Sequence, residues 1–263
     1  MDGLDSKSKD RELKIIFWLI LLLTGGIFLA DVFVQRVKLT QLNKNAKAGN
    51  GRAMFILGQM YEEGFRVCKD ESEAIKWYNQ GGAAGDSRCM FRLGILYKSG
   101  RFVARDYAKS FKWFQKAAQT GHSDAMFELG LAYKNGEGVA REYKRAVEWL
   151  SKSAVKGKKD AFLPLAVLYE KAAKAGDSDA MVGLGLAYKN NWGLERDYTK
   201  ALEWFYRAAE KGNYDAMYNL GLMYHNGYGV EIDYEQAVKW YKEAANLGQK
   251  DAEQKLGDLG ETW

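Results

Sequence analysis

AMFELGLAYKNGEGVAREYKRAVEWLSKSAVKGKKD, residues Ala125–Asp160, is a 36-residue unit that recurs along most of the chain. Successive copies start at small residues: Ala53, Cys89, Ala125, Ala161, Ala180, Ala216 and Ala252. The steps between these starts are 36, 36, 36, 19, 36 and 36 residues. Five of the eight tryptophans share one position of the repeat: Trp77, Trp113, Trp149, Trp204 and Trp240. Self-similarity at such a period is the signature of a repeat architecture.

Each copy has the pattern of two helices joined by a glycine-rich loop. In the quoted copy, Leu129 and Tyr133 share one face of a first helix, and Gly136 breaks that helix. Trp149 and Ala154 share one face of a second helix, so we predict that the tryptophans pack in the core. Because one such pair cannot bury its own apolar face, successive pairs must stack. The sequence predicts an all-α fold, an α-solenoid of antiparallel helix pairs preceded by one transmembrane helix.

The repeats resemble the Sel-one-like repeat (SLR) family, relatives of the tetratricopeptide repeats. The last full repeat carries the family pattern at Ala216, Leu220, Gly221, Tyr224, Gly227, Gly229, Val230, Asp233, Ala237, Trp240, Ala244, Ala245 and Gly248. Other copies depart from it in the loop: Arg66 and Phe102 replace the second loop glycine, and Asn191 replaces the first. The resemblance covers about residues 53–259. It implies the fold and a role as a protein-binding scaffold without enzymatic activity.

The repeat register divides the chain into successive segments. They are a tail (1–14), a transmembrane signal-anchor (15–34), a capping helix (35–52), three repeats (53–160), a degenerate single-helix repeat (161–179), two repeats (180–251) and a C-terminal cap (252–263).

Residues 15–34 are apolar except for Thr24 and Asp31, and about 20 such residues span a bilayer. An uncleaved membrane anchor is the favoured interpretation, and a cleaved signal peptide is the alternative. The charges on the two sides of the segment set no clear orientation. A short tail before a long C-terminal domain favours an inner-membrane protein whose repeats lie outside the cytoplasm, in the periplasm.

Residues 161–179 interrupt the repeat. Ala161 to Tyr169 match the start of a first helix, whereas Tyr169 to Gly176 match the end of a second helix. One helix therefore stands where two are expected. Since helices alternate in direction along a solenoid, a single inserted helix changes the alternation. We predict that the first helix beginning near Ala180 runs opposite to the one beginning near Ala125, and that two sub-stacks, 35–160 and 180–259, meet at this helix.

No pattern predicts a catalytic site, a metal site or a cofactor. The two histidines, His122 and His225, lie in different parts of their repeats and cannot share a metal ion. Ser153 and Lys156 have the spacing of a β-lactamase nucleophile motif, but its companion motifs are missing. Ser153 occupies a small-residue packing position, so a β-lactamase-like enzyme is only a distant alternative.

The third, seventh and tenth positions of the first helices form a separate stripe, away from the leucine–tyrosine face. Either these residues pack between neighbouring first helices, or they form an apolar surface with a charged rim for a protein ligand. The predicted partner-binding residues are Phe55, Phe91, Phe127, Tyr218, Gln59, Ile95, Leu131, Lys98, Lys134, Lys189 and His225.

The formal net charge of +5 is spread through the repeats, so it gives no indication of nucleic-acid binding. We predict neither a nucleic-acid partner nor a small-molecule substrate. The predicted function is that of a membrane-anchored scaffold or adaptor that binds another protein. The alternative is a periplasmic immunity protein that neutralises a secreted lipase-type toxin, as some proteins of the resembled family do.

Overall fold

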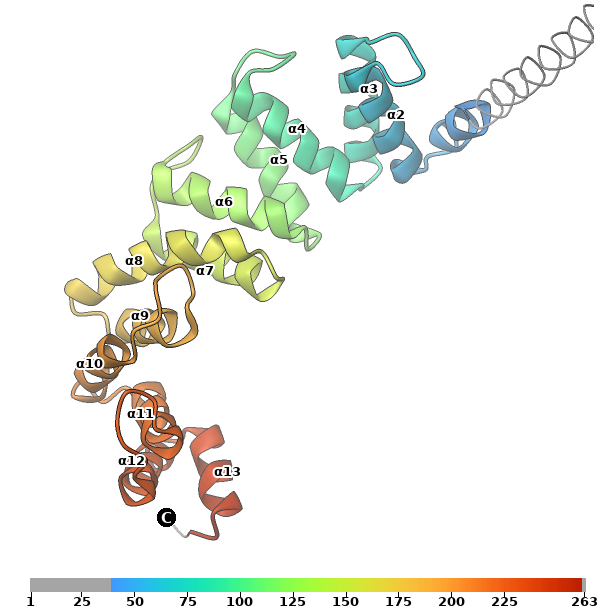
Figure 1. Cartoon of the computed structure of the whole chain (residues 1–263). Helices are drawn as coiled ribbons and strands as arrows, with labels where there is room; N and C mark the ends of the chain where they lie inside the picture. The colour runs from blue at the N-terminus through green and yellow to red at the C-terminus, as the bar shows by residue number, and fades with distance from the viewer. Residues whose placement is uncertain (1–38, 262–263) are drawn as a thin grey trace, which may run out of the picture. The chain divides into compact units, whose positions relative to one another are not determined.

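The structure, a computed structural model, describes residues 39–261, and every regular element in that range is helical (Figure 1). The prediction of an all-α fold is therefore confirmed for this part of the chain. Contacts divide the chain into two compact units, Met1–Leu93 and Gly94–Trp263. The boundary falls inside the helix α4 (Ser87–Ser99).

The first unit contains a helix over residues 39–47, followed by α2 (Gly51–Glu63) and α3 (Glu71–Ala83). Ala46 is fully buried in the same cluster as Ala53 and Leu57, which joins the segment 39–47 to the apolar face of α2. The side chain of Asn50 accepts a hydrogen bond from the amide of Ala53 and so caps α2.

The second unit continues with the same kind of helices. Their bounds are α5 (Tyr107–Gln119), α6 (Ser123–Asn135), α7 (Tyr143–Val155), the 3-10 turn η1 (Lys159–Ala161), α8 (Phe162–Lys174), α9 (Ser178–Asn190), α10 (Tyr198–Ala209), α11 (Tyr214–Asn226), α12 (Tyr234–Asn246) and α13 (Lys250–Asp258). From α5 onward, each helix packs mainly against its neighbours in the chain, which is the arrangement of an α-solenoid.

Local sequence sets where these helices begin and end. Asp106, Asp197 and Asp233 each accept a 2.9 Å hydrogen bond from the amide three residues later, at the start of a second helix. In the loops, Phe102 and Asn191 replace glycines of the family pattern. Each still has the positive φ angle that favours glycine, 68° for Phe102 and 59° for Asn191. The backbone of the loop is thus retained even where the residue is less suited to it.

The helix pairs approach closely because a glycine lies under a large side chain. A Cβ atom added to Gly221 of α11 would lie 2.4 Å from the ring of Tyr241 in α12, which is fully buried. Gly58, Gly94, Gly130 and Gly185 stand in the same relation to Tyr78, Phe114, Leu150 and Phe205. The repeated glycine is therefore needed for close contact between the two helices of a repeat.

The prediction that the tryptophans pack in the core is confirmed in part, since Trp77 belongs to a core cluster and Trp204 and Trp240 pack against another. Trp77 is buried, but Trp113, Trp149, Trp204 and Trp240 are only half-buried. A cation lies over three of these rings: Lys116 over Trp113, Lys152 over Trp149 and Arg207 over Trp204. The residue after each tryptophan is the one that packs on the glycine and is the more deeply buried of the two.

Contacts confirm that the single helix changes the alternation of directions. Ser153 at the end of α7 bonds the carbonyl of Ser123 at the start of α6, so these helices are antiparallel. The ammonium of Lys171, late in α8, lies 4.2 Å from the ring centre of Tyr143 at the start of α7. Phe162 at the start of α8 stacks on Trp192, just beyond α9. After three reversals, α9 runs opposite to α6, as predicted.

The helix α8 combines the contacts of both helix types. Toward α7 it acts as a first helix. The hydroxyl of Tyr169 lies 3.4 Å from that of Ser151, and in the next full repeat the hydroxyl of Tyr224 lies 2.5 Å from that of Tyr206. Toward α9 it acts as a second helix. The ring pair Phe162–Trp192 repeats the stacking of Tyr198 on Tyr228.

The boundary between compact units is a separate matter from the predicted sub-stacks. The boundary between compact units falls in α4, and α8 lies inside the second unit, so the predicted sub-stacks 35–160 and 180–259 stay a prediction. The predicted transmembrane segment, 15–34, lies outside the described residues. Among residues 39–261, no helix is both long and apolar enough to cross a membrane.

Candidate functional site

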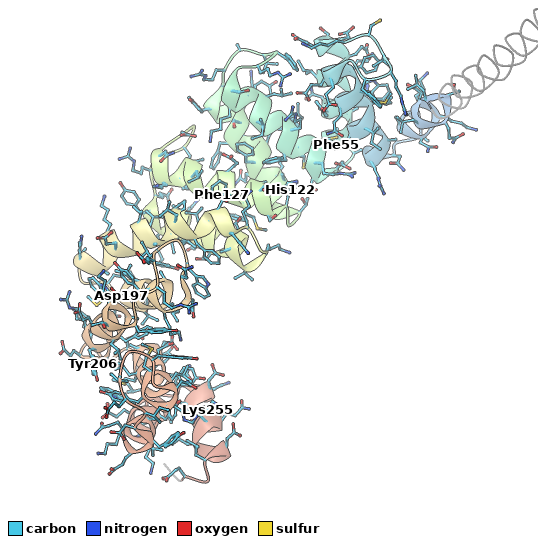
Figure 2. All side chains as sticks on the ribbon, in the orientation of Figure 1. Phe55, His122, Phe127, Asp197, Tyr206 and Lys255 are labelled. Atoms are coloured by element: carbon cyan, nitrogen blue, oxygen red, sulfur yellow. The ribbon has the colours of Figure 1, made fainter. Side chains whose placement is uncertain are left out.

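The eleven predicted partner-binding residues are all half-buried, so each is partly accessible and partly packed. Phe55 on α2 lies 6.1 Å from the ring of Tyr78 and carries the guanidinium of Arg88 over its face (Figure 2). Phe127 on α6 has the ammonium of Lys158 at 5.7 Å (Figure 2). These positions are thus partly packed and partly accessible, and their part in binding a partner stays a prediction.

The remaining apolar candidates follow the same pattern. Phe91, Ile95 and Leu131 are half-buried on their first helices. Gln59 lines a cavity of about 330 Å³ together with residues of the segment 39–47. Tyr218 packs against Tyr241 at 5.8 Å, and burial followed by the charge of Asp251 raises its pKa.

The charged candidates differ more from one another. Lys98 forms ion pairs with Glu128 at 2.8 Å and Glu137 at 3.5 Å. Lys189 donates to the amide oxygen of Asn219 at 2.9 Å, and burial lowers its pKa. Lys134 is half-buried, and Nδ1 of His225 is buried without a hydrogen-bond partner in the described part of the chain.

Glu62 occupies the first-unit position equivalent to Lys98. The stripe predicted on the first helices included it in a charged rim, but only 2% of its surface is exposed. Its carboxylate accepts hydrogen bonds from the Tyr78 hydroxyl at 2.7 Å and from Nε of Arg92 at 2.9 Å. The predicted rim position is therefore a buried ion pair.

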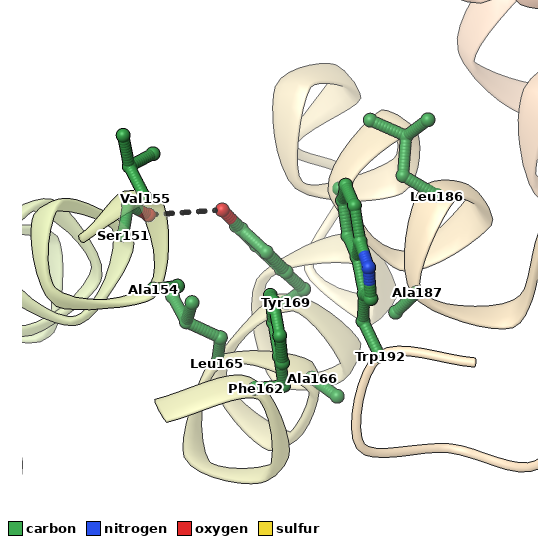
Figure 3. A pocket seen from close by; sticks show the side chains of 11 residues that line it. Ser151, Ala154, Val155, Phe162, Leu165, Ala166, Tyr169, Leu186, Ala187 and Trp192 are labelled. Carbon is green, nitrogen blue, oxygen red and sulfur yellow. Dashed lines mark hydrogen bonds between the residues drawn. The ribbon is translucent and has the colours of Figure 1, made fainter. Parts of the chain in front are cut away.

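An apolar groove that sequence reasoning missed lies between α7 and α9, on top of α8 (Figure 3). Its volume is about 220 Å³. It is lined by Ser151, Ala154, Val155, Phe162, Leu165, Ala166, Tyr169, Gly183, Leu186, Ala187 and Trp192. The polar side-chain groups in this lining include Ser151 and Tyr169, whose hydroxyls are 3.4 Å apart.

The groove follows from the single helix. Because α8 serves both neighbours, α7 and α9 pack on the same helix. Several large apolar side chains in this region stay open to solvent: Val155 is 89% exposed and Trp192 39%. The missing half-repeat was visible in the sequence and could have pointed to this place, although not to a groove.

Groups with potential chemistry elsewhere have structural roles. Ser153 is fully buried, and its hydroxyl donates to the carbonyl of Ser123 at 2.8 Å. Cys89 is buried, which raises the pKa of its thiol to about 12, whereas Cys68 is exposed. No group of His, Cys, Asp and Glu residues in the range 39–261 has the arrangement of a metal site.

The sequence matches the Sel1 repeat family over residues 51–86, 87–122, 123–157, 167–177, 178–213 and 215–249. No curated protein matches it. Among solved structures, a Sel1 repeat protein from Oxalobacter formigenes is 33% identical, with 76% of this chain and 89% of that protein covered and a TM-score of 0.44.

Two further solved structures are similar at lower sequence identity. A protective antigen of uropathogenic Escherichia coli with an SLR fold is 28% identical over 84% of this chain, with a TM-score of 0.48. The chain spans about half of that protein's length, 51%. An immunity protein of Pseudomonas aeruginosa is 21% identical, with 63% of this chain and 67% of that protein covered and a TM-score of 0.30.

Proposed function

Because the chain belongs to the Sel1 repeat family, we propose that it is a scaffold that binds another protein, with the groove between α7 and α9 as a main docking site. The observation that carries this proposal is the exposure of apolar side chains around the groove, above all Val155 at 89%. A concave apolar surface with a large exposed side chain at its edge is typical of the centre of a protein–protein interface.

The lining of the groove selects the chemistry of the partner. Two exposed lysines, Lys156 and Lys159, follow Val155 in the chain, but neither lines the groove. The ammonium of Lys156 lies beside Gly121, in the turn before α6. The apolar lining therefore favours a partner that inserts an apolar side chain.

Substitution at the groove edge tests this function. A photo-crosslinking residue at position 155 in the full chain should capture a specific partner in native cells, whereas the same residue at position 112, exposed on α5, should not. Val155→Glu should then weaken binding of the identified, purified partner about tenfold or more. The melting temperature of the Val155→Glu variant should stay unchanged, since Val155 is 89% exposed. Equal capture from both positions, or equal affinity of Val155→Glu and Lys112→Glu, would count against the groove.

The identity of the captured partner also decides between the two narrower functions. A secreted toxin that loses its activity when it binds the chain would establish the immunity function. A resident envelope protein would establish the scaffold function. Both functions use the same docking surface, so the groove prediction holds in either case.

The proposed scaffold is held at an inner membrane by residues 15–34, with the repeats outside the cytoplasm. Support comes from the apolar sequence of this segment, which has the length of a membrane-spanning helix. The full chain should stay with the membrane fraction after a carbonate wash, and a chain lacking residues 1–34 should not. Recovery of a mature protein without its first 26–30 residues would show instead that the segment is a cleaved signal peptide.

A further inference from the structure

A polar arrangement repeats along the first helices and forms what we call rungs. Each rung joins a residue near the end of one first helix, the large residue that packs on the repeat glycine, and a residue on the next first helix. In the first unit this rung is Glu62, Tyr78 and Arg92. Its centre is a carboxylate that accepts hydrogen bonds from the tyrosine hydroxyl and the guanidinium.

The next rung, in the second unit, also contains a carboxylate. Lys98 binds Glu128 at 2.8 Å, across the same spacing of 30 residues that separates Glu62 from Arg92. In both rungs a cation and an acid neutralise each other within the repeat array. The chain thus supplies its own carboxylate at each of these two places.

The rung of Lys189, Phe205 and Asn219 has lost the acid. The ammonium lies 6.0 Å from the Phe205 ring centre and donates to the neutral side chain of Asn219 at 2.9 Å. Asn219 is itself 8% exposed, and its amide nitrogen donates a hydrogen bond to the backbone carbonyl of Asp215. A partly buried cation without a counter-charge is unfavourable, so an external anion is attracted here.

The rung of His225, Tyr241 and Lys255 has donors and no acid. His225 takes the place of Glu62, Tyr241 that of Tyr78 and Lys255 that of Arg92, by the same sequence spacings. Nδ1 of His225 and the Tyr241 hydroxyl are both buried without a hydrogen-bond partner in the described part of the chain. Buried polar atoms are nearly always satisfied in proteins, which points to an occupant that completes the rung.

We propose that the first helices α9, α11 and α13 bind an acidic segment of a partner protein, one carboxylate at Lys189 and a second at His225, Tyr241 and Lys255. A carboxylate is favoured over other anions because Glu62 fills the equivalent place in the first unit. Packed helices are about 8–10 Å apart, and an extended chain rises about 3.3 Å per residue. The two acids therefore stand about three residues apart in the partner. This site shares only α9 with the apolar groove.

The two histidines make a direct test possible. The probe is a glycine–serine peptide with blocked ends and two glutamates three residues apart, added to the full chain with isotope-labelled histidine. The imidazole signals of His225 should shift and saturate. The signals of His122, which caps α6, should stay in place as an internal control. The same peptide with glutamines should cause no shift.

Variants then assign the carboxylates. Lys189→Gln and Lys255→Gln should each weaken binding of the glutamate peptide about tenfold, whereas Lys112→Gln on α5 should not. Circular dichroism confirms that each variant is folded. An unmoved His225 signal would mean that water alone fills the rung and would overturn the proposal. An equal, saturating shift with inorganic phosphate or with a short RNA would overturn the assignment to an acidic protein segment.

Discussion

Gly221→Ala should lower the free energy of unfolding by about 2–3 kcal/mol, because the added methyl group overpacks a filled core. The new Cβ would lie 2.4 Å from the ring of Tyr241, which is fully buried. Gly257 holds the same repeat position in α13, where no second helix follows among the described residues. Nothing lies within 4 Å of a Cβ added there. Gly257→Ala should therefore raise the free energy of unfolding by about 0.5–1 kcal/mol through helix propensity alone.

Urea titration of both variants measures the difference, and amide hydrogen exchange in α11 and α12 locates it. Local exchange matters because repeat arrays do not always unfold in one step. Equal destabilisation by the two substitutions would show that helix packing does not depend on the glycine. Gly221→Ala without loss of stability would show that α12 can move away from α11 at little cost.

Most of the fold could be predicted from the spacing of residues. The period of 36 residues, the helix pairs and the reversed direction of α9 all follow from sequence register and from counting helices. Register does not say which of two adjacent aromatic residues faces inward. Trp240 and Tyr241 both lie near the inner face of α12, and the glycine on α11 decides for Tyr241.

The candidate sites could be predicted less well, because they depend on departures from the repeat. The groove exists where residues 161–179 supply one helix for two neighbours, and its volume is a matter of three-dimensional packing. Burial of Glu62 depends on Tyr78 and Arg92, which lie far away in the sequence. A pattern at one helix position cannot reveal such partners.

Arg92→Ala should lower the free energy of unfolding by about 3 kcal/mol at neutral pH, since it removes one partner of a buried ion pair. The side chain of Glu62 is 2% exposed and keeps the Tyr78 hydroxyl as a donor, but it loses the guanidinium that binds it. Lys76→Ala is the matched control: Lys76 pairs with Glu73 at 2.8 Å on the surface, and its loss should change stability little.

The pH dependence of this variant distinguishes a charge effect from lost packing. Without the guanidinium, burial disfavours the charged form of Glu62, so its pKa in the folded variant rises above that in the unfolded chain. The folded state then binds more protons than the unfolded state between these two pKa values, and stability rises as the pH falls from 7 toward 5. Thermal unfolding across this range measures the slope. The double variant Glu62→Gln, Arg92→Ala cannot titrate here and should lack this slope. If the single variant showed no recovery at low pH, the loss would come from the missing arginine side chain and not from the charge of Glu62.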